Sequence, residues 1–285
     1  MTGPERVEAW LERAAGLLAE AGVEEPRFEA RLLLAGAAGW APEAILARRS
    51  EPVPEEILLR ADAMLERRAR REPASHIFGQ REFWGLEFQV TSEVLDPRPD
   101  SETLIEAALA RIGNRAAPLR VLDLGTGTGC LLLAILNELP YARGLGIDLS
   151  PAALRVAEAN AARLGLSERA AFALGAWGQG LAEEFDLILV NPPYIPSGEL
   201  DGLQPEVARW EPRLALDGGR DGLEAYRRMA PDLARLLAPS GFAAVEIGLG
   251  QAAEVGSICA RSGLRILDCA RDLGGRGRCL LLARG

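Results

Sequence analysis

The stretch from Leu119 to Gly129 reads LRVLDLGTGTG and decides the fold class of this chain. It joins a short apolar strand to three glycines at alternate positions, and a helical pattern follows over about 129–138. Glycines let the backbone turn tightly and approach a ligand, and the N-terminus of a helix offers free N–H groups to it. The stretch therefore predicts a strand, a ligand-binding loop and a helix. The loop residues are Gly125, Thr126, Gly127, Thr128 and Gly129.

Apolar strand patterns alternate with amphipathic helical patterns from residue 119 to the end of the chain. This alternation predicts an α/β fold with a Rossmann-like, seven-stranded, mainly parallel sheet. The expected strands are 119–124, 143–148, 170–175, 185–190, 242–247, 264–268 and 278–283. The expected helices are 129–138, 151–164, 223–237 and 251–262.

Four amphipathic helical patterns precede the α/β part and predict a small helical bundle. They cover residues 5–21 and 26–39, a short stretch after Pro42, and 54–71. The last one ends in the arginine-rich run Glu66-Arg67-Arg68-Ala69-Arg70-Arg71. One interpretation is a solvated helix C-terminus, where cations suit the helix dipole. The other is a patch for an acidic or RNA-associated partner.

Residues 74–90 change character, because aromatic and β-branched residues alternate around Gly79 and Gly85. This pattern predicts a β-hairpin between the two halves of the chain. We therefore expect a helical domain over 1–73, a hairpin linker over 74–92 and a catalytic domain over 93–285.

Composition excludes several functional classes. The chain has 285 residues, a net charge of −9 and a pI near 5.0, which does not suit non-specific binding to phosphate backbones. Its four cysteines form no CxxC pair and its one histidine is His76, so we expect no zinc site and a structural histidine. The longest apolar run, 130–136, is too short for a membrane span.

An acid after the second strand narrows the choice of ligand. Gly146-Ile147-Asp148 ends the strand, and a carboxylate there can accept hydrogen bonds from both ribose hydroxyls. A dinucleotide loop has the spacing GxGxxG, whereas Cys130 occupies the third glycine position here. A ligand without a pyrophosphate fits better, so the loop and Asp148 together favour S-adenosylmethionine (SAM) over NAD.

A second motif follows the strand over 185–190. The chain runs from that strand directly into Asn191-Pro192-Pro193-Tyr194, which should lie on the same rim of the sheet as the glycine loop. The Asn191 side-chain oxygen and the Pro192 carbonyl can accept both N–H groups of a planar amide or amine, and Tyr194 offers it a flat face. We expect Asn191, Pro192 and Tyr194 to act in catalysis and all four residues to contact the substrate.

The motif Asn-Pro-Pro-Tyr occurs in adenine-N6 DNA methyltransferases and in protein glutamine-N5 methyltransferases, and the rest of the chain resembles the second group. It is similar, over nearly its whole length, to the HemK/PrmC family of peptide chain release factor glutamine methyltransferases. The stretches that carry the resemblance are EFWGL at 82–86, PRPDSE at 97–102, EPRLAL at 211–216, DGL at 221–223, EIGLGQ at 246–251 and RDLGGR at 271–276.

The resemblance implies methyl transfer from SAM to the side-chain amide nitrogen of the glutamine in the Gly-Gly-Gln motif of class I release factors, which modulates translation termination. It implies SAM contacts at 125–129, Asp148, Trp177 and Asn191, and substrate contacts at 191–194. The helical domain would dock the protein substrate, and no metal is needed. We expect a cytoplasmic monomer that binds neither DNA nor membranes.

Two residues depart from the family pattern. Ser101 stands where the family usually has Thr, and Asp96 stands where it usually has an apolar residue. The segment 98–102 has two interpretations, a helix start with an N-cap and a wall of the active site, and one segment can be both.

Three alternatives stay open at this point. An adenine-N6 DNA methyltransferase would flip a base out of the duplex and carry a basic recognition region, whereas the extra domain here is net acidic. A non-catalytic SAM-binding protein is possible in principle, although no motif is broken. An NAD-dependent oxidoreductase is disfavoured by the glycine spacing and by the lack of a histidine in the α/β part.

Overall fold

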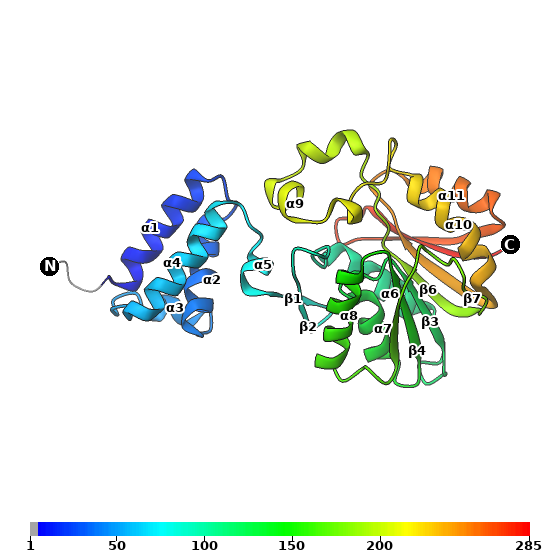
Figure 1. Cartoon of the computed structure of the whole chain (residues 1–285), viewed down its shortest axis with the longest axis horizontal. Coiled ribbons are helices and arrows are strands. Elements are labelled where there is room, and N and C mark those ends of the chain that lie inside the picture. Colours follow the sequence, from blue (N-terminus) through cyan, green and yellow to red (C-terminus); the bar gives the residue numbers. More distant parts are fainter. Residues whose placement is uncertain (1–4) are drawn as a thin grey trace. The chain divides into compact units, whose positions relative to one another are not determined.

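The structure, a computed structural model, describes residues 5–285 and divides into two units. The helical unit extends to Gly79 and includes Gln204–Trp210, and the α/β unit comprises Gln80–Leu203 and Glu211–Gly285. Figure 1 labels most of the helices and strands of both units. This division assigns the segment 74–79 and the segment 204–210 to the helices, whereas the sequence suggested boundaries at 73 and 92.

The predicted helices of the helical unit are confirmed. Apolar residues at helical spacing bury one face of each long helix, and Trp10, Leu33 and Leu65 are at most 3% exposed. The indole N–H of Trp10 donates to Asp62 Oδ1 at 2.8 Å, which satisfies its one polar atom. The helices of this unit are α1 (Val7–Glu20), α2 (Pro26–Ala38), α3 (Ala44–Ala47), α4 (Glu55–Ala69), α5 (Ala74–Phe78) and α9 (Pro205–Trp210).

The arginine-rich run at the end of α4 is mostly engaged inside the helical unit. Arg68 is buried and its guanidinium contacts Glu29 and Glu206. Its neighbours Arg67 and Arg71 pair with Glu72 and Glu206 respectively. Arg70 is 73% exposed and lies 3.8 Å from Glu66. Neither interpretation from sequence fits Arg68 and Arg71, because these cations hold the unit's own carboxylates.

The hairpin prediction is wrong at its start. Residues 74–78 form helix α5, which ends at Gly79 with a left-handed φ of 73°, so a helix C-cap explains this glycine. The two turn residues of the hairpin are Trp84 and Gly85, whose φ values of 53° and 70° are those that a two-residue type I′ turn requires. The antiparallel strands are β1 (Gln80–Phe83) and β2 (Leu86–Gln89).

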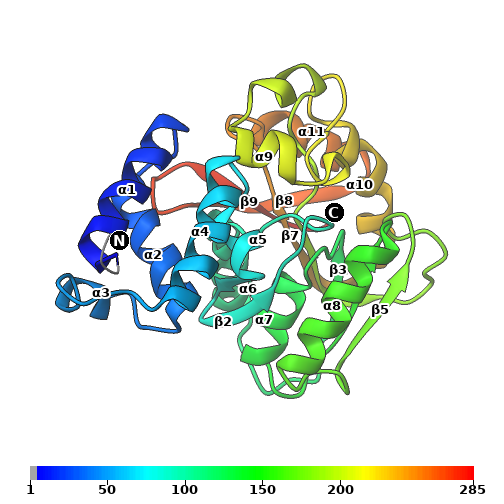
Figure 2. The same ribbon diagram turned by 60° about the vertical axis from the view of Figure 1, so that its left-hand side comes forward.

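The predicted Rossmann-like sheet is confirmed in the α/β unit. Within residues 5–285 it has seven strands in the order β5-β4-β3-β6-β7-β9-β8, and β3 to β7 run parallel. Strand β9 pairs antiparallel with β7 and with the edge strand β8, and all three are labelled in Figure 2. The strands are β3 (Arg120–Leu124), β4 (Arg143–Asp148), β5 (Ala170–Leu174), β6 (Phe185–Val190), β7 (Leu237–Glu246), β8 (Leu264–Arg271) and β9 (Gly277–Arg284).

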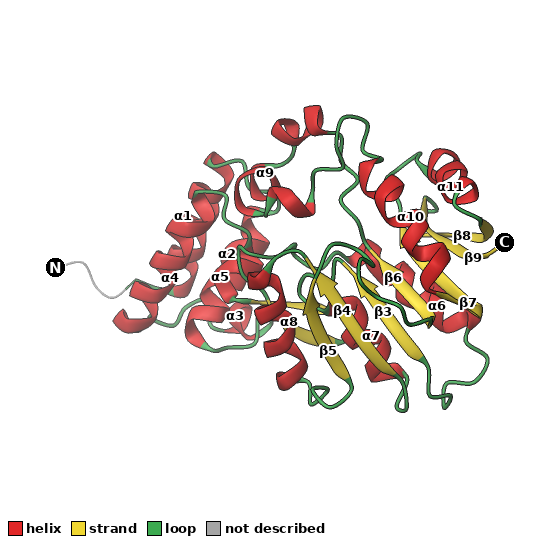
Figure 3. Ribbon diagram, turned by 45° about the vertical axis from the view of Figure 1, so that its right-hand side comes forward, coloured by secondary structure: helices red, strands yellow, loops and turns green. Residues whose placement is uncertain are grey.

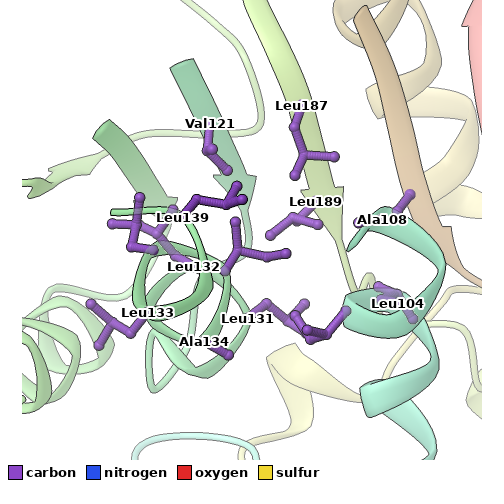
Figure 4. Packing of buried hydrophobic residues seen from close by; sticks show 14 of the residues in the cluster. Leu104, Ala108, Val121, Leu131, Leu132, Leu133, Ala134, Leu139, Leu187 and Leu189 are labelled. Carbon is purple, nitrogen blue, oxygen red and sulfur yellow. The ribbon is translucent and has the colours of Figure 1, made fainter. Parts of the chain in front are cut away.

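Helices cover both faces of this sheet, as Figure 3 shows. Alternate residues of a strand point to opposite faces, so Val121 packs in one layer and Leu122 in the other. Figure 4 shows the first layer, in which Leu104 and Leu132 of two helices pack against Val121 and strand residue Leu187. The first layer contains α6 (Glu102–Arg111) and α7 (Cys130–Glu138), and the second contains α10 (Glu224–Leu236) and α11 (Ala252–Arg261). Helix α8 (Pro151–Arg163) packs against β4 and β5.

The strand order positions a ligand site. The chain leaves β3 toward β4 on one side, whereas β6 lies on the other side of β3 and leads toward β7. Ligands in open α/β sheets bind at such a reversal, outside the carboxyl ends of the strands. The residues that follow these ends are Gly125, Leu149 and Asn191.

Candidate active site

The glycine loop after β3 combines three left-handed residues. Gly125, Gly127 and Gly129 have φ values of 76°, 54° and 79°, which L side chains rarely adopt. A Cβ on Gly125 or Gly127 would meet no atom within 4 Å, so that side of the loop is open. A Cβ on Gly129 would lie 3.2 Å from side-chain atoms of Leu133 and Ala157. The first two glycines leave room for a ligand, and the third lets α7 and α8 pack closely.

Asp148, the last residue of β4, holds this loop in place. Its Oδ2 accepts a hydrogen bond from Gly127 N at 2.9 Å, and its Oδ1 accepts one from Ser150 N at 2.9 Å. Each carboxylate oxygen has further lone-pair capacity. The carboxylate can therefore keep both backbone bonds and still accept hydroxyl donors of a ligand.

A cavity of about 270 Å³ lies against the loop, within the α/β unit. Apolar side chains such as Ile147 and Ala153 line it together with a few polar groups, which is typical of small-molecule sites. The predicted cofactor residues that line it are Gly125, Gly127, Asp148, Trp177 and Asn191.

The other predicted loop residues support the loop and do not line this cavity. Thr126 Oγ1 donates to Asp123 Oδ2 at 2.7 Å, and both residues are at most 5% exposed. Thr128 Oγ1 accepts from Cys130 N at 3.3 Å and is also buried. Burial raises the pKa of Asp123 to about 7, although the bond from Thr126 lowers it. These side chains fix the loop from its protein side.

Trp177, after β5, lines the cavity with its backbone in the left-handed region at φ 50°. That conformation is rare for a bulky residue and is often found at functional sites. The next residue explains how it is held, since Gly178 N donates to Asp232 Oδ2 at 3.1 Å and a Cβ there would lie 2.4 Å from Leu236. Close packing of Gly178 on α10 thus fixes the position of the indole. Its contact with SAM stays a prediction.

The segment Asn191-Pro192-Pro193-Tyr194 follows β6 on the same rim. Asn191 and Pro193 line the cavity, whereas Pro192 is buried. The Tyr194 carbonyl accepts from Gln251 Nε2 at 3.1 Å. The predicted acceptor and the flat ring therefore lie on one braced segment.

A glycine packs directly against this braced segment. A Cβ on Gly222 would lie 2.4 Å from the Tyr194 carbonyl oxygen, so only a glycine fits at that position. Gly222 and Gln251 lie in two of the stretches that carry the family resemblance, and their role was not visible in sequence.

A buried hydrogen-bond network lies behind Asn191. Its Nδ2 donates to Ser101 Oγ at 3.1 Å, and the Ser101 hydroxyl donates to Glu246 Oε2 at 2.5 Å. The Tyr194 hydroxyl donates to Glu246 Oε1 at 3.2 Å. Ser101 is the N-cap residue of α6, but its side chain makes no cap hydrogen bond, and its hydroxyl contacts Asn191 and Glu246 instead.

The Glu246 carboxyl, at the end of β7, is 1% exposed. Burial raises its pKa to about 7, while the bond from Ser101 and the charge of Arg278 act in the opposite direction. Arg278 Nη2 in turn contacts Asp100 Oδ2 at 2.9 Å. Glu246 lies in one of the stretches that carry the family resemblance, and its sequence context indicates no role.

A second buried carboxyl lies near the site. Glu211 accepts from Arg98 Nη2 at 2.6 Å through Oε2, and its side chain is 1% exposed. Burial raises the pKa of Glu211 to about 7, Arg98 lowers it, and the charge of Asp96 raises it. Asp96, the unusual acid of the sequence, is itself 4% exposed. This departure from the family pattern thus adds negative charge beside Glu211.

The described residues, 5–285, contain neither a metal-binding cluster nor a membrane-spanning helix. They hold no group of three or more His, Cys, Asp or Glu residues placed to bind a metal ion. In the same range, every helix is too short or too polar to cross a membrane.

Comparison with known proteins supports the family resemblance. The family described as PrmC N-terminal domain matches residues 9–79, and the family described as Methyltransferase domain matches residues 116–236. Relatives named release factor glutamine methyltransferase come from Rhodospirillum rubrum, Caulobacter vibrioides and Agrobacterium fabrum, at 49%, 45% and 42% identity. The matches cover 96%, 96% and 99% of this chain and 84%, 95% and 99% of the relatives. The chain belongs to the release factor glutamine methyltransferase family.

Family membership confirms the predicted methyltransferase class and accounts for both units. The N-terminal family covers α1 to α5, which agrees with the structural limit of the helical unit at Gly79. The methyltransferase family covers the glycine loop, Asp148 and the Asn-Pro-Pro-Tyr segment. The NAD alternative is not supported, because the match is to a methyltransferase domain.

Proposed function

We propose that this family member transfers a methyl group from SAM to the side-chain amide nitrogen of the glutamine in the Gly-Gly-Gln motif of class I release factors. The relatives' shared name supports the substrate. The observation that carries the proposal within the chain is that Asn191 lines the same cavity as Gly125, Gly127 and Asp148. Such a reaction belongs in the cytoplasm, where translation terminates.

The cavity wall fits SAM chemically. The open side of the glycine loop leaves room for the nucleoside, and the Asp148 carboxylate can accept from its ribose hydroxyls. Trp177 and the apolar lining would cover the adenine. Bound SAM supplies an electrophilic methyl group on a positively charged sulfur.

The chain's own residues would position the substrate amide. Conjugation with the carbonyl makes an amide nitrogen a poor nucleophile, so its orientation matters most. The Asn191 side-chain oxygen and the Pro192 carbonyl accept its two N–H bonds and direct the nitrogen at the methyl carbon. The nitrogen forms the new C–N bond, the C–S electron pair stays on sulfur, and one N–H proton is released. Tyr194 would cover the face of the amide.

Methyl transfer from labelled SAM to a purified class I release factor tests this function. A second factor carries alanine in place of the Gly-Gly-Gln glutamine, and mass spectrometry locates the methyl group. We expect label on that glutamine amide alone. Label in DNA with none in the factor would instead support an adenine methyltransferase. SAM binding with no transfer to either would support a non-catalytic protein.

A further inference from the structure

While Glu246 is ionised, the network behind Asn191 has a single direction of donation. The Glu246 carboxylate has only acceptor oxygens, and the hydroxyls of Ser101 and Tyr194 donate to its two oxygens at 2.5 Å and 3.2 Å. The Ser101 proton is therefore committed to Glu246. The Ser101 oxygen is left with lone pairs only, and it accepts from Asn191 Nδ2 at 3.1 Å.

This direction determines which end of the Asn191 amide faces the cavity. An asparagine can rotate by 180° and exchange its oxygen for its NH2 group at little steric cost. A lone-pair acceptor at Ser101 attracts the NH2 end and so turns Oδ1 away from the network. Oδ1 is the end that accepts an N–H group of the substrate amide in the proposed reaction.

We propose that Glu246 and Ser101 are positioning residues that fix the polarity of the Asn191 amide, and thereby select a substrate that presents an NH2 group. The proposal rests on the proposed methyltransferase function. It concerns residues far apart in sequence, since 90 positions separate Ser101 from Asn191 and 145 separate it from Glu246. Both hydrogen bonds join one side chain to another, so substitutions of these side chains test the effect directly.

Protonation of Glu246 would allow the Asn191 amide to rotate by 180°. A protonated Glu246 can donate to Ser101, and the Ser101 hydroxyl can then donate to Asn191 Oδ1. The NH2 end of Asn191 would then face the NH2 group of the substrate, and two donors repel each other. Because burial places the pKa of Glu246 at about 7, this exchange falls within the range of an activity assay. The other charged and titratable groups that interact with Glu246 are Arg278, Asp100, Tyr194, Tyr226, Cys130 and Cys279.

The variant Glu246→Gln tests the proposal, because its amide keeps the shape and can donate to Ser101. We expect the single-turnover rate of methyl transfer at pH 8 to fall about tenfold to a hundredfold, which corresponds to one lost and one repulsive hydrogen-bonding contact. The affinity for SAM should change less than about threefold and the melting temperature little. Ser101→Ala should lower the rate about fivefold, and Ser101→Thr, which keeps the hydroxyl, should restore it.

The pH profile separates positioning from mere packing. The rate of the unmodified enzyme should rise with pH around 7, and Glu246→Gln should lose that rise. Glu254→Gln is the matched control, since Glu254 is an exposed residue of α11. A Glu246→Gln variant that folds, keeps its rate within twofold and retains the rise around pH 7 would overturn the proposal.

A readout without release factor keeps this inference separate from the proposed function. In protein with 15N-labelled asparagine, the Asn191 side-chain NH2 resonances should shift and exchange faster with solvent in Glu246→Gln and Ser101→Ala. Those resonances should be unchanged in Glu254→Gln. Resonances that stay the same in all three variants would contradict the fixed polarity, even if methyl transfer is confirmed. Conversely, the expected shifts without any methyl transfer would retain the polarity and reject only the substrate assignment.

Discussion

Arg71 and Glu206 form a two-bond ion pair within the helical unit, with Nε 2.6 Å from Oε1 and Nη2 2.6 Å from Oε2. The two residues are 135 positions apart, and each side chain is 16% exposed. Burial alone would raise the pKa of Glu206, but the bonds from Arg71 and Arg68 lower it below its usual value. Segment 204–210, which follows the Asn-Pro-Pro-Tyr segment in sequence, thus belongs energetically with the N-terminal helices.

The first prediction is that Arg71→Ala destabilises the chain. A charge-assisted, two-bond pair of low exposure contributes about 1–3 kcal/mol, and its removal leaves Glu206 with only Arg68. Urea unfolding of the full chain should show that loss. Arg70→Ala is the control, because Arg70 is 73% exposed and lies 3.8 Å from Glu66, so it should change stability by less than about 0.5 kcal/mol. Equal effects of the two variants would show that the pair contributes nothing.

The second prediction separates the roles of Asp148 and Asn191. Asp148→Ala removes the proposed acceptor for the ribose, one bond to the glycine loop at Gly127 and one to Ser150, so SAM affinity should fall about tenfold to a hundredfold. Asn191→Ala should abolish methyl transfer while SAM affinity stays within about threefold, because in the proposed reaction its oxygen orients the substrate amide. Calorimetry with SAM and a labelled-methyl assay measure the two quantities. Loss of SAM affinity alone in both variants would refute the assigned roles.

The sheet and its glycine loop could be predicted well from the sequence because their signals are local. Three glycines at alternate positions and an acid at the end of the next strand lie close together in sequence, as Gly125 and Asp148 do. The position of α5 was missed, since residues 74–78 alternate as a strand would and only Gly79, in its left-handed conformation, ends the helix. A glycine next to an alternating pattern can be a turn or a helix end, and sequence alone does not distinguish them.

The supports of the site could not be predicted because they join distant residues. The bond between Ser101 and Glu246 spans 145 positions, and the one between Arg68 and Glu206 spans 138. The direction of the loop hydroxyls was not visible in sequence for a different reason. Glycine spacing places the loop at the ligand but does not say which way Thr126 points, and Asp123 draws its hydroxyl inward.

The third prediction concerns pH and Asp123. Burial raises its pKa to about 7, so the folded state keeps a proton that the unfolded state has lost above about pH 4. The folded state then binds more protons between those values, and the contribution of Asp123 to stability falls as pH rises toward 7.

The variant Asp123→Asn does not titrate and can still accept from Thr126. The free energy of unfolding of the variant minus that of the unmodified chain should therefore increase by about 1–3 kcal/mol from pH 5 to pH 8. Denaturant titrations at constant salt measure this difference. The control is Asp201→Asn at an exposed position, and its stability should change with pH as that of the unmodified chain does. A constant difference for Asp123→Asn would rule out a raised pKa.

The fourth prediction distinguishes two glycines of the same loop. Alanine at either Gly127 or Gly129 must adopt a left-handed backbone, which costs about 1–2 kcal/mol. A methyl group on Gly129 would also press on Leu133 and Ala157 at 3.2 Å, so this variant should lose about 2–4 kcal/mol of stability. A methyl group on Gly127 meets no protein atom within 4 Å and instead projects into open space at the cavity wall.

Gly127→Ala should therefore be the more stable of the two variants and the weaker in SAM affinity, by about tenfold or more. Thermal unfolding without ligand ranks the two variants by stability, and calorimetric titration with SAM ranks them by affinity. Opposite orders in stability and affinity distinguish a ligand contact from general damage to the loop, which would lower both quantities in the same variant. If Gly129→Ala is the worse variant by both measures, the open side of the loop is not where SAM binds.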